Sequence, residues 1–190
     1  MIILKNALIQ SHNYIKAVVE EGDIVVDATA GNGNDTLMLA KLVGETGKVY
    51  SFDIQEKAIN NTYKKLSDEG VEKRVVLIKD GHQNMDKYVT EKGKVKAVMF
   101  NLGYLPGGDH SIATKPSTTI EAIKKAMNII MTGGLISIVV YYGGDTGFEE
   151  RDKVMEFVCQ INPKEFVVMK ACYVNQINCP PFLLCIEKIK

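Results

Sequence analysis

The sequence predicts an α/β fold built around a mostly parallel sheet. Short apolar stretches rich in β-branched residues alternate along the chain with longer segments of helical periodicity. This alternation requires a parallel sheet, because parallel neighbours can be joined only by a crossover connection, which usually contains a helix. The last two apolar stretches have no helical segment between them, so we expect them to form an antiparallel hairpin at one edge. The prediction is seven strands with helices on both faces.

Seven segments have the composition of buried strands. They are short, apolar and bounded by glycine or by polar and charged residues. They comprise residues 23–27, 48–53, 75–78, 95–101, 135–142, 166–174 and 182–189.

Five segments carry a helical pattern, at residues 11–21, 36–42, 55–69, 117–131 and 147–160. The first is expected either to pack against the sheet edge or to cover a bound cofactor. The third is expected to bury one face, made of Ala58, Ile59, Thr62, Tyr63 and Leu66. Pro116 and Ser117 mark the start of the fourth helix, and Gly133-Gly134 marks its end.

Length and composition predict one globular domain spanning residues 1–190. The chain is 46% hydrophobic and 24% charged, which is ordinary for a folded domain. Its 23 basic and 23 acidic side chains cancel, which argues against extensive binding of duplex nucleic acid but permits a local basic patch. We find no leader segment and no apolar run long enough to cross a bilayer, so a cytoplasmic protein without membrane attachment is expected.

The cysteines give no sign of a metal site. They form no CxxC pair and no histidine follows them, so zinc is not expected. We expect all four to be core thiols of strands, as suits a reducing compartment: Cys159, Cys172, Cys179 and Cys185.

The most specific local pattern is the segment DATAGNGNDT, residues 27–36, between the first strand and the helix that follows it. Gly31 and Gly33 allow a sharp turn and leave no Cβ in the way of a ligand. Such a loop lies at the carboxyl ends of the strands, where open α/β sheets bind ligands. The candidate cofactor residues in this segment are Asp27, Thr29, Ala30, Gly31, Asn32, Gly33, Asn34 and Asp35.

Three further features favour S-adenosylmethionine as the ligand. Asp53 ends the next strand at the spacing where a carboxylate accepts hydrogen bonds from ribose hydroxyls. Thr36 replaces the third glycine of GxGxxG, which disfavours a pyrophosphate. Asp80-Gly81-His82 ends the third strand, where a carboxylate can accept from an adenine amino group. The alternative is a plain βα turn with chance acidic strand ends, and Gln55 fits either a ribose contact or a solvated helix start.

The fourth strand leads into a second glycine-rich loop, NLGYLPGGDH, residues 101–110. Methyl transfer is an in-line displacement at carbon, so most of the catalytic task is positioning. The loop's acceptors could orient a neutral amine or take its proton. Its candidate catalytic residues are Asn101, Tyr104, Asp109 and His110, and Asn101 is also a candidate cofactor contact. They could instead only cap backbone groups of a turn. Tyr141 and Tyr142 either offer aromatic faces to a target base or lie half-buried at the sheet rim.

The motifs DATAGNGNDT, NLGYLPGGDHSIAT and NCPPFLLCIEK resemble those of a small bacterial family of methyltransferases long labelled rRNA methylases. Its members are tRNA (mnm(5)s(2)U34)-methyltransferases of the MnmM type. The resemblance covers nearly the whole chain and implies a Rossmann-like class I methyltransferase fold, in which one strand of seven is reversed. It further implies S-adenosylmethionine as cofactor, the amine of 5-aminomethyl-2-thiouridine at the tRNA wobble position as substrate, and a homodimer. His110 departs from the lysine expected there in many relatives.

Two other functions remain open from the sequence. One is a methyltransferase acting on rRNA or on a small molecule. The other is a non-catalytic nucleotide-binding module, against which the missing third glycine and the terminal hairpin both count.

Overall fold

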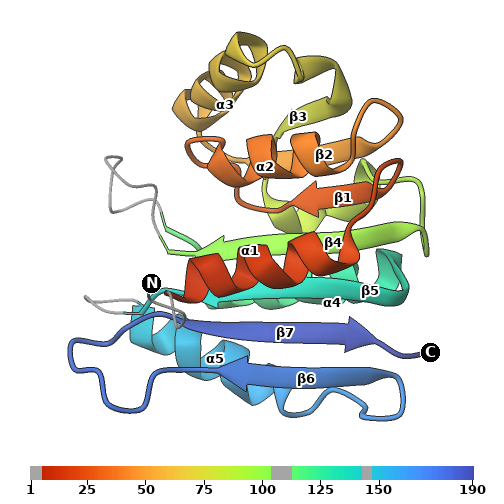
Figure 1. Cartoon of the computed structure of the whole chain (residues 1–190). Helices are drawn as coiled ribbons and strands as arrows, with labels where there is room; N and C mark the ends of the chain where they lie inside the picture. The colour runs from red at the N-terminus through yellow and green to blue at the C-terminus, as the bar shows by residue number, and fades with distance from the viewer. Residues whose placement is uncertain (1–5, 104–112, 143–146) are drawn as a thin grey trace.

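The computed structural model describes residues 6–103, 113–142 and 147–190. Over these residues the chain forms a seven-stranded sheet in the order β3-β2-β1-β4-β5-β7-β6 (Figure 1). The strands are β1 (Ile24–Asp27), β2 (Lys48–Asp53), β3 (Val75–Lys79), β4 (Val95–Leu102), β5 (Ile130–Val140), β6 (Phe166–Ala171) and β7 (Phe182–Lys188). Neighbours from β3 to β5 are parallel, whereas β7 is antiparallel to both β5 and β6. The predicted fold class and reversed strand are confirmed.

Helices cover both faces of this sheet. They are α1 (Ala7–Val18), α2 (Asn34–Leu42), α3 (Glu56–Asp68), α4 (Pro116–Ile129) and α5 (Gly147–Val158), with short 3₁₀ turns η1 (Glu72–Arg74) and η2 (His82–Lys87). One core lies under α1, α2 and α3, and the other lies under η2, α4 and α5. Along β4 the side chains alternate between them: Val98 and Phe100 enter the second core, and Met99 the first. Burial on both faces explains why the central strands are almost continuously apolar.

The first helix begins earlier than predicted and lies over the sheet rather than at its edge. The side chain of Asn6 caps it by accepting a hydrogen bond from the Ile9 N–H at 3.0 Å. Its buried face packs on β5, β7 and β4 (Figure 1), and a buried hydrogen bond of 2.6 Å joins Ser11 Oγ to Ser137 Oγ of β5. The expected packing against the sheet edge is therefore wrong, because its apolar stripe fits the uncovered centre of the sheet.

Gly133-Gly134 does not end α4. The helix stops at Ile129 and β5 begins at the next residue, so both glycines fall inside the strand. The pairing with β4 shifts there, from Val95 opposite Ile130 to Ala97 opposite Leu135. A Cβ on Gly134 would approach the Lys96 carbonyl oxygen to 2.9 Å. The glycines thus serve an irregularity in the strand, where the backbones approach closely.

Two smaller expectations were also wrong. Tyr63 is 56% exposed, because α3 buries only the narrow stripe of Ala58, Thr62 and Leu66. Only Cys185 is a core thiol, since the other three cysteines are exposed: Cys159 directly follows α5, and Cys172 and Cys179 lie between β6 and β7. Within the described parts of the chain, no helix has the length and apolar character needed to cross a membrane.

Candidate active site

Four polar residues predicted from the sequence lie at the carboxyl ends of four consecutive strands. Asp80 directly follows β3, Asp53 ends β2, Asp27 ends β1, and Asn101 is the penultimate residue of β4. The strand order reverses between β1 and β4, and such a switch point is where open α/β sheets bind ligands. The structure therefore brings together residues that are separated by as many as 74 positions, from Asp27 to Asn101.

The loop after β1 is a tight glycine turn packed against α3. Gly31 and Gly33 have positive φ angles of 54° and 76°. The Ala30 N–H donates to the Phe52 carbonyl at 2.8 Å, which ties the loop to β2. A Cβ on Gly33 would lie 2.9 Å from Thr62 Cα, so a larger residue would push α3 away. The sequence thus keeps this turn free of side chains at both glycine positions.

Asp53 connects this loop to the end of β2. One carboxylate oxygen accepts the Gly31 N–H at 3.0 Å, and the other accepts the Gln55 N–H at 2.9 Å. The side chain is only partly buried, and each oxygen retains acceptor capacity after one hydrogen bond. Asp53 can therefore hold the loop and accept from two ribose hydroxyls. Gln55 itself caps α3 without a side-chain cap hydrogen bond.

Asp27 is fully buried and supports the loop from within. Its carboxylate accepts the Thr29 N–H at 3.1 Å and the Thr36 hydroxyl at 2.6 Å. Burial, followed by repulsion from Asp35, raises the Asp27 pKa from 3.8 to about 7, although the two hydrogen bonds oppose this rise. Thr36, which occupies the position of the third glycine of a GxGxxG motif, is thus a hydrogen-bond donor to a buried carboxyl group.

The raised pKa of Asp27 predicts how stability changes with pH. The folded state holds a proton that the unfolded state has lost, so this stabilisation is complete at low pH and disappears as pH rises from about 4 through about 7. Asp27→Asn removes the titration, so the wild-type free energy of unfolding should fall relative to the variant's by roughly 1.4 kcal/mol per pH unit across this window. Urea unfolding at several pH values measures this. The exposed Asp152→Asn should track the wild type, and parallel curves for wild type and Asp27→Asn would contradict the prediction.

Asp80 and His82 form the β3 side of the site. Asp80 accepts the Gly81 N–H at 2.7 Å, the Asn84 amide at 2.9 Å and the Tyr88 hydroxyl at 2.9 Å. Burial opposes ionisation of Asp80, but these donors prevail and lower its pKa. His82 is buried, which lowers its pKa, and its neutral ring donates Nδ1–H to the Ala28 carbonyl at 3.2 Å. Asp80 therefore keeps a charged carboxylate at the strand end.

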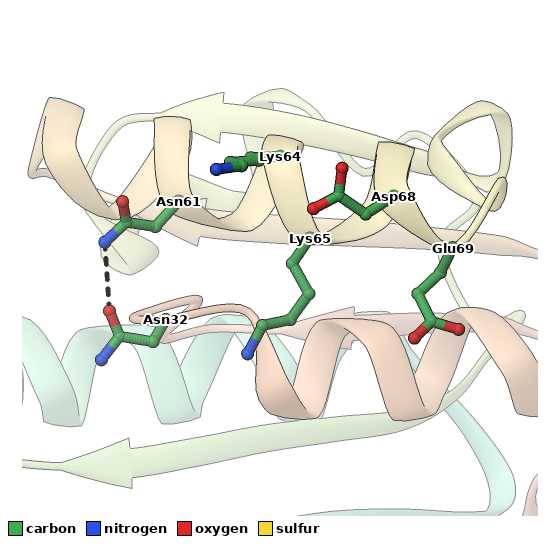
Figure 2. A pocket seen from close by; sticks show the side chains of 6 residues that line it. All are labelled: Asn32, Asn61, Lys64, Lys65, Asp68 and Glu69. Atoms are coloured by element: carbon green, nitrogen blue, oxygen red, sulfur yellow. Dashed lines mark hydrogen bonds between the residues drawn. The ribbon is translucent and has the colours of Figure 1, made fainter.

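Asn32 and Asn34 contact α3 instead of the strand ends. Asn32 Oδ1 accepts from the Asn61 amide at 3.2 Å, and Asn34 Oδ1 accepts from the Lys65 ammonium. Figure 2 shows the Asn32–Asn61 hydrogen bond beside a hollow. The volume of this hollow is about 400 Å³. The hollow is lined by Asn32, Asn61, Lys64, Lys65, Asp68 and Glu69. Because none of the four strand-end residues lines it, we do not assign the cofactor to this hollow.

Asn101 is fixed from two sides. Its backbone N–H donates to Thr29 Oγ1 at 2.8 Å, and its Nδ2 donates to Asp35 Oδ2 at 2.6 Å. Asp35 lies in the first turn of α2, where the helix dipole favours a negative charge. The carboxylate sets the amide orientation, because a reversed amide would place two oxygens together. Asn101 Oδ1 is buried and has no hydrogen-bond partner within the described residues.

His12 of α1 also binds Asp35, and sequence analysis missed it. Its Nε2 lies 2.8 Å from Asp35 Oδ1, with 22% of the His12 side chain and 7% of the Asp35 side chain exposed. The only signal in the sequence was a histidine in a helix expected either to pack against the sheet edge or to cover the cofactor. Nothing local in that helix specified a partner 23 residues away.

Tyr104, Asp109 and His110 lie outside the described residues. The residues on either side of their segment are joined, because the Thr114 N–H donates to the Gly103 carbonyl at 3.0 Å and the Gly103 N–H donates to Thr114 Oγ1 at 2.9 Å. Thr114 Oγ1 in turn donates to Glu150 at 2.6 Å, and burial raises the Glu150 pKa. Glu150, which holds Thr114 beside this segment, is thus a second buried polar residue that sequence analysis did not single out.

The two rim tyrosines face opposite sides of the sheet. Tyr141 is 40% exposed, and burial followed by the nearby Asp35 charge raises its pKa. Tyr142 packs on Phe148 and Phe182 and lies 5.1 Å from the Arg151 guanidinium. Only Tyr141 is therefore placed on the Asp35 side of the site.

The fold and the strand-end site define a class I S-adenosylmethionine-dependent methyltransferase. The chain belongs to the family described as "Putative rRNA methylase", whose family model matches residues 49–187. A second family model, for protein-L-isoaspartate(D-aspartate) O-methyltransferases, matches residues 6–90.

Several proteins are similar over nearly the whole chain. A tRNA (mnm(5)s(2)U34)-methyltransferase of Arabidopsis thaliana chloroplasts is 42% identical over 93% of this chain and 67% of its own length. A "putative rRNA-methylase" from Clostridium thermocellum superposes with a TM-score of 0.97 at 63% identity, covering 99% of this chain and 100% of that one. A "putative methyltransferase" from Streptococcus mutans in complex with SAH superposes with a TM-score of 0.90 at 45% identity. The match covers 98% of this chain and 99% of that one.

S-adenosylmethionine is therefore the cofactor, as the sequence predicted. The residues present fit it: the glycine turn leaves backbone open at the switch point, Asp53 presents a carboxylate, and Asp80 presents a second.

Proposed function

We propose that the protein methylates the amine of 5-aminomethyl-2-thiouridine at the tRNA wobble position, producing the 5-methylaminomethyl form. The observation that carries this proposal is Asn101, whose amide is oriented by Asp35 so that its buried Oδ1 lacks a partner among the described residues. An amine N–H is the donor that such an oxygen requires, since a buried unpaired acceptor is costly. The similarity to the chloroplast tRNA methyltransferase supports the same substrate.

Within this proposal, the residues at different strand ends bind different parts of the cofactor and the substrate. Asp53 accepts hydrogen bonds from the ribose of the cofactor, Asp80 from its adenine, and the Gly31 and Gly33 turn holds its methionine part. S-adenosylmethionine supplies the methyl group. Asn101 orients the substrate nitrogen, so the catalytic contribution of this side is positioning.

The test is methylation of a defined tRNA. We expect purified protein to convert tRNA carrying 5-aminomethyl-2-thiouridine to the 5-methylaminomethyl form, detected by mass spectrometry of the released nucleosides. The matched control is the same tRNA with an unmodified wobble uridine, which lacks the amine and should not react. Methylation of rRNA, or of the control tRNA, would reject the proposed substrate and favour the rRNA alternative.

We further propose that the protein is a homodimer that uses the β6–β7 hairpin. Support comes from the exposed apolar side chains on this hairpin and the segments next to it: Val167, Met169, Val174, Ile177 and Ile189. Val174 and Ile177 are 94% and 83% exposed, which is unusual for a pair of apolar residues so close in sequence.

Light scattering should therefore give the mass of two chains at micromolar concentration. Val174→Lys combined with Ile177→Lys should shift the protein towards the mass of one chain, because two charges would need to be buried. Tyr63→Lys, at an exposed aromatic of α3, is the control and should leave the mass unchanged. A single-chain mass for the wild type would reject the dimer.

We propose a cytoplasmic location as well. All four cysteines are free, which suits a reducing compartment.

A further inference from the structure

His12 and Asn101 share one carboxylate. The imidazole Nε2 of His12 lies 2.8 Å from Asp35 Oδ1, and the Asn101 amide nitrogen lies 2.6 Å from Asp35 Oδ2. Both contacts end on one carboxylate with a 7% exposed side chain, so α1 brings the imidazole to the same carboxylate that orients the Asn101 amide.

These contacts also fix the tautomer of His12. Each oxygen of the Asp35 carboxylate acts as an acceptor, so a neutral His12 ring must carry its proton on Nε2. Nδ1 then holds a lone pair, and within the described parts of the chain nothing donates to it. The same arrangement, a carboxylate behind a histidine whose other nitrogen is free, serves general bases in hydrolases.

The proposed reaction needs such a base. An alkyl amine is protonated at neutral pH and cannot attack carbon until it loses that proton. Asn101 Oδ1 can accept a hydrogen bond from the amine, but an amide oxygen is too weakly basic to take the proton. An imidazole ordinarily titrates near neutral pH and is suited to this task.

We propose that His12 is the proton acceptor for the substrate amine and that Asp35 positions both His12 and Asn101. This inference rests on the proposed amine methylation. The N–H bond breaks and leaves its electron pair on nitrogen, while the proton joins His12 Nδ1. The freed pair forms the new N–C bond, and the C–S bond of the methyl donor breaks with its pair passing to sulfur. Asp35 stabilises the imidazolium, whose 22% exposed side chain can return the proton to solvent.

Other groups around His12 bear on its pH dependence. Asp35 provides negative charge, and Asp27 behind it gains its charge only as the pH rises through about 7, because burial raises its pKa. Burial, followed by the nearby Asp35 charge, raises the pKa of Tyr141. Lys16 lies one turn further along α1. Cys185, on the strand under this helix, has a pKa raised to about 11 by burial and therefore stays neutral. The described titratable groups to consider are thus Asp35, Asp27, Tyr141, Lys16 and Cys185.

The kinetic test compares wild type with His12→Gln in single-turnover methylation at saturating cofactor across pH. Glutamine can still donate to Asp35 but offers no basic nitrogen. We expect the wild-type rate to reach a plateau as the pH rises. The variant should be slower by roughly a hundredfold at neutral pH, and its rate should keep rising with pH, because the amine must then lose its proton to solvent. Lys153→Gln, which alters an exposed charge on α5, is the control and should match the wild type.

Two measurements do not depend on turnover. Nitrogen-15 NMR of the histidine rings at alkaline pH should show His12 as the Nε2–H tautomer, assigned by its loss in His12→Gln. Calorimetry should show that S-adenosylhomocysteine binds His12→Gln within about threefold of wild type. Thermal unfolding of the variant confirms that it is folded.

The outcomes separate this inference from the proposed function. If the wild type does not methylate the aminomethyl tRNA, the proposed function fails. If the wild type is active but His12→Gln keeps its rate and pH plateau, the role of His12 is wrong. A loss of S-adenosylhomocysteine affinity as large as the loss of rate, or an Nδ1–H tautomer, would also overturn it, because His12 would then be a cofactor anchor.

Discussion

Asp53→Ala is expected to weaken cofactor binding by roughly ten- to a hundredfold or more. In the proposed site the variant loses the carboxylate assigned to the ribose hydroxyls, and a hydrogen bond to a charged group contributes roughly 1.5–3 kcal/mol. It also removes the partner of the Gly31 N–H, so the turn that we propose holds the methionine part loses one of its links to β2. Titration calorimetry with S-adenosylmethionine measures the change directly.

A matched control separates this effect from the loss of any carboxylate. Asp23→Ala removes an aspartate that lies just before β1, at the amino end of that strand and away from the strand-end site. Its carboxylate accepts a hydrogen bond from the Glu20 N–H at 2.8 Å. It should leave cofactor affinity unchanged. Near-wild-type affinity in Asp53→Ala would show that the ribose lies elsewhere.

The strand ends could be predicted because each depended on a local pattern. Asp27, Asp53 and Asp80 each follow an apolar run, and parallel strands bring their carboxyl ends to one edge whatever the distance in sequence. The glycine turn was equally local, since its positive φ angles require glycine at two positions. Sequence periodicity is therefore sufficient to place these side chains together at the carboxyl ends of the strands.

The contacts between elements could not be predicted in this way. His12 meets Asp35 only because α1 crosses the sheet over β5, and the buried Ser11–Ser137 hydrogen bond joins residues 126 positions apart. Glu150 likewise finds Thr114 and Thr119 through the packing of α5 beside α4. Gly133-Gly134 looked like a helix end because a glycine pair fits a C-cap and a strand irregularity equally well. Tertiary packing selects between such alternatives, and one sequence does not reveal it.

The second large effect is expected at Asn101. Asn101→Ala should lower the single-turnover rate by roughly a hundred- to a thousandfold, the scale seen when one positioned polar group of an active site is removed. The variant loses the buried Oδ1 that we propose accepts from the substrate amine, and Asp35 loses one of the two side-chain donors that the described residues give it. The Asn101 backbone N–H still donates to Thr29, so the loop on the cofactor side keeps its link to β4. S-adenosylhomocysteine affinity should therefore change by no more than a few-fold.

The rate and the cofactor affinity must be measured on the same preparation, because a large loss of rate with little loss of affinity is what distinguishes a substrate-side role. Single-turnover methylation of aminomethyl-thiouridine tRNA gives the rate, and cofactor titration gives the affinity. Asn162→Ala, which removes an exposed asparagine near the start of β6, should change neither. Asn101→Asp should be at least as slow as Asn101→Ala, since a second carboxylate would repel Asp35 and lose the amide donor. A rate near wild type in Asn101→Ala would mean that the amine is held elsewhere, and a collapse of cofactor affinity would place Asn101 in the cofactor site instead.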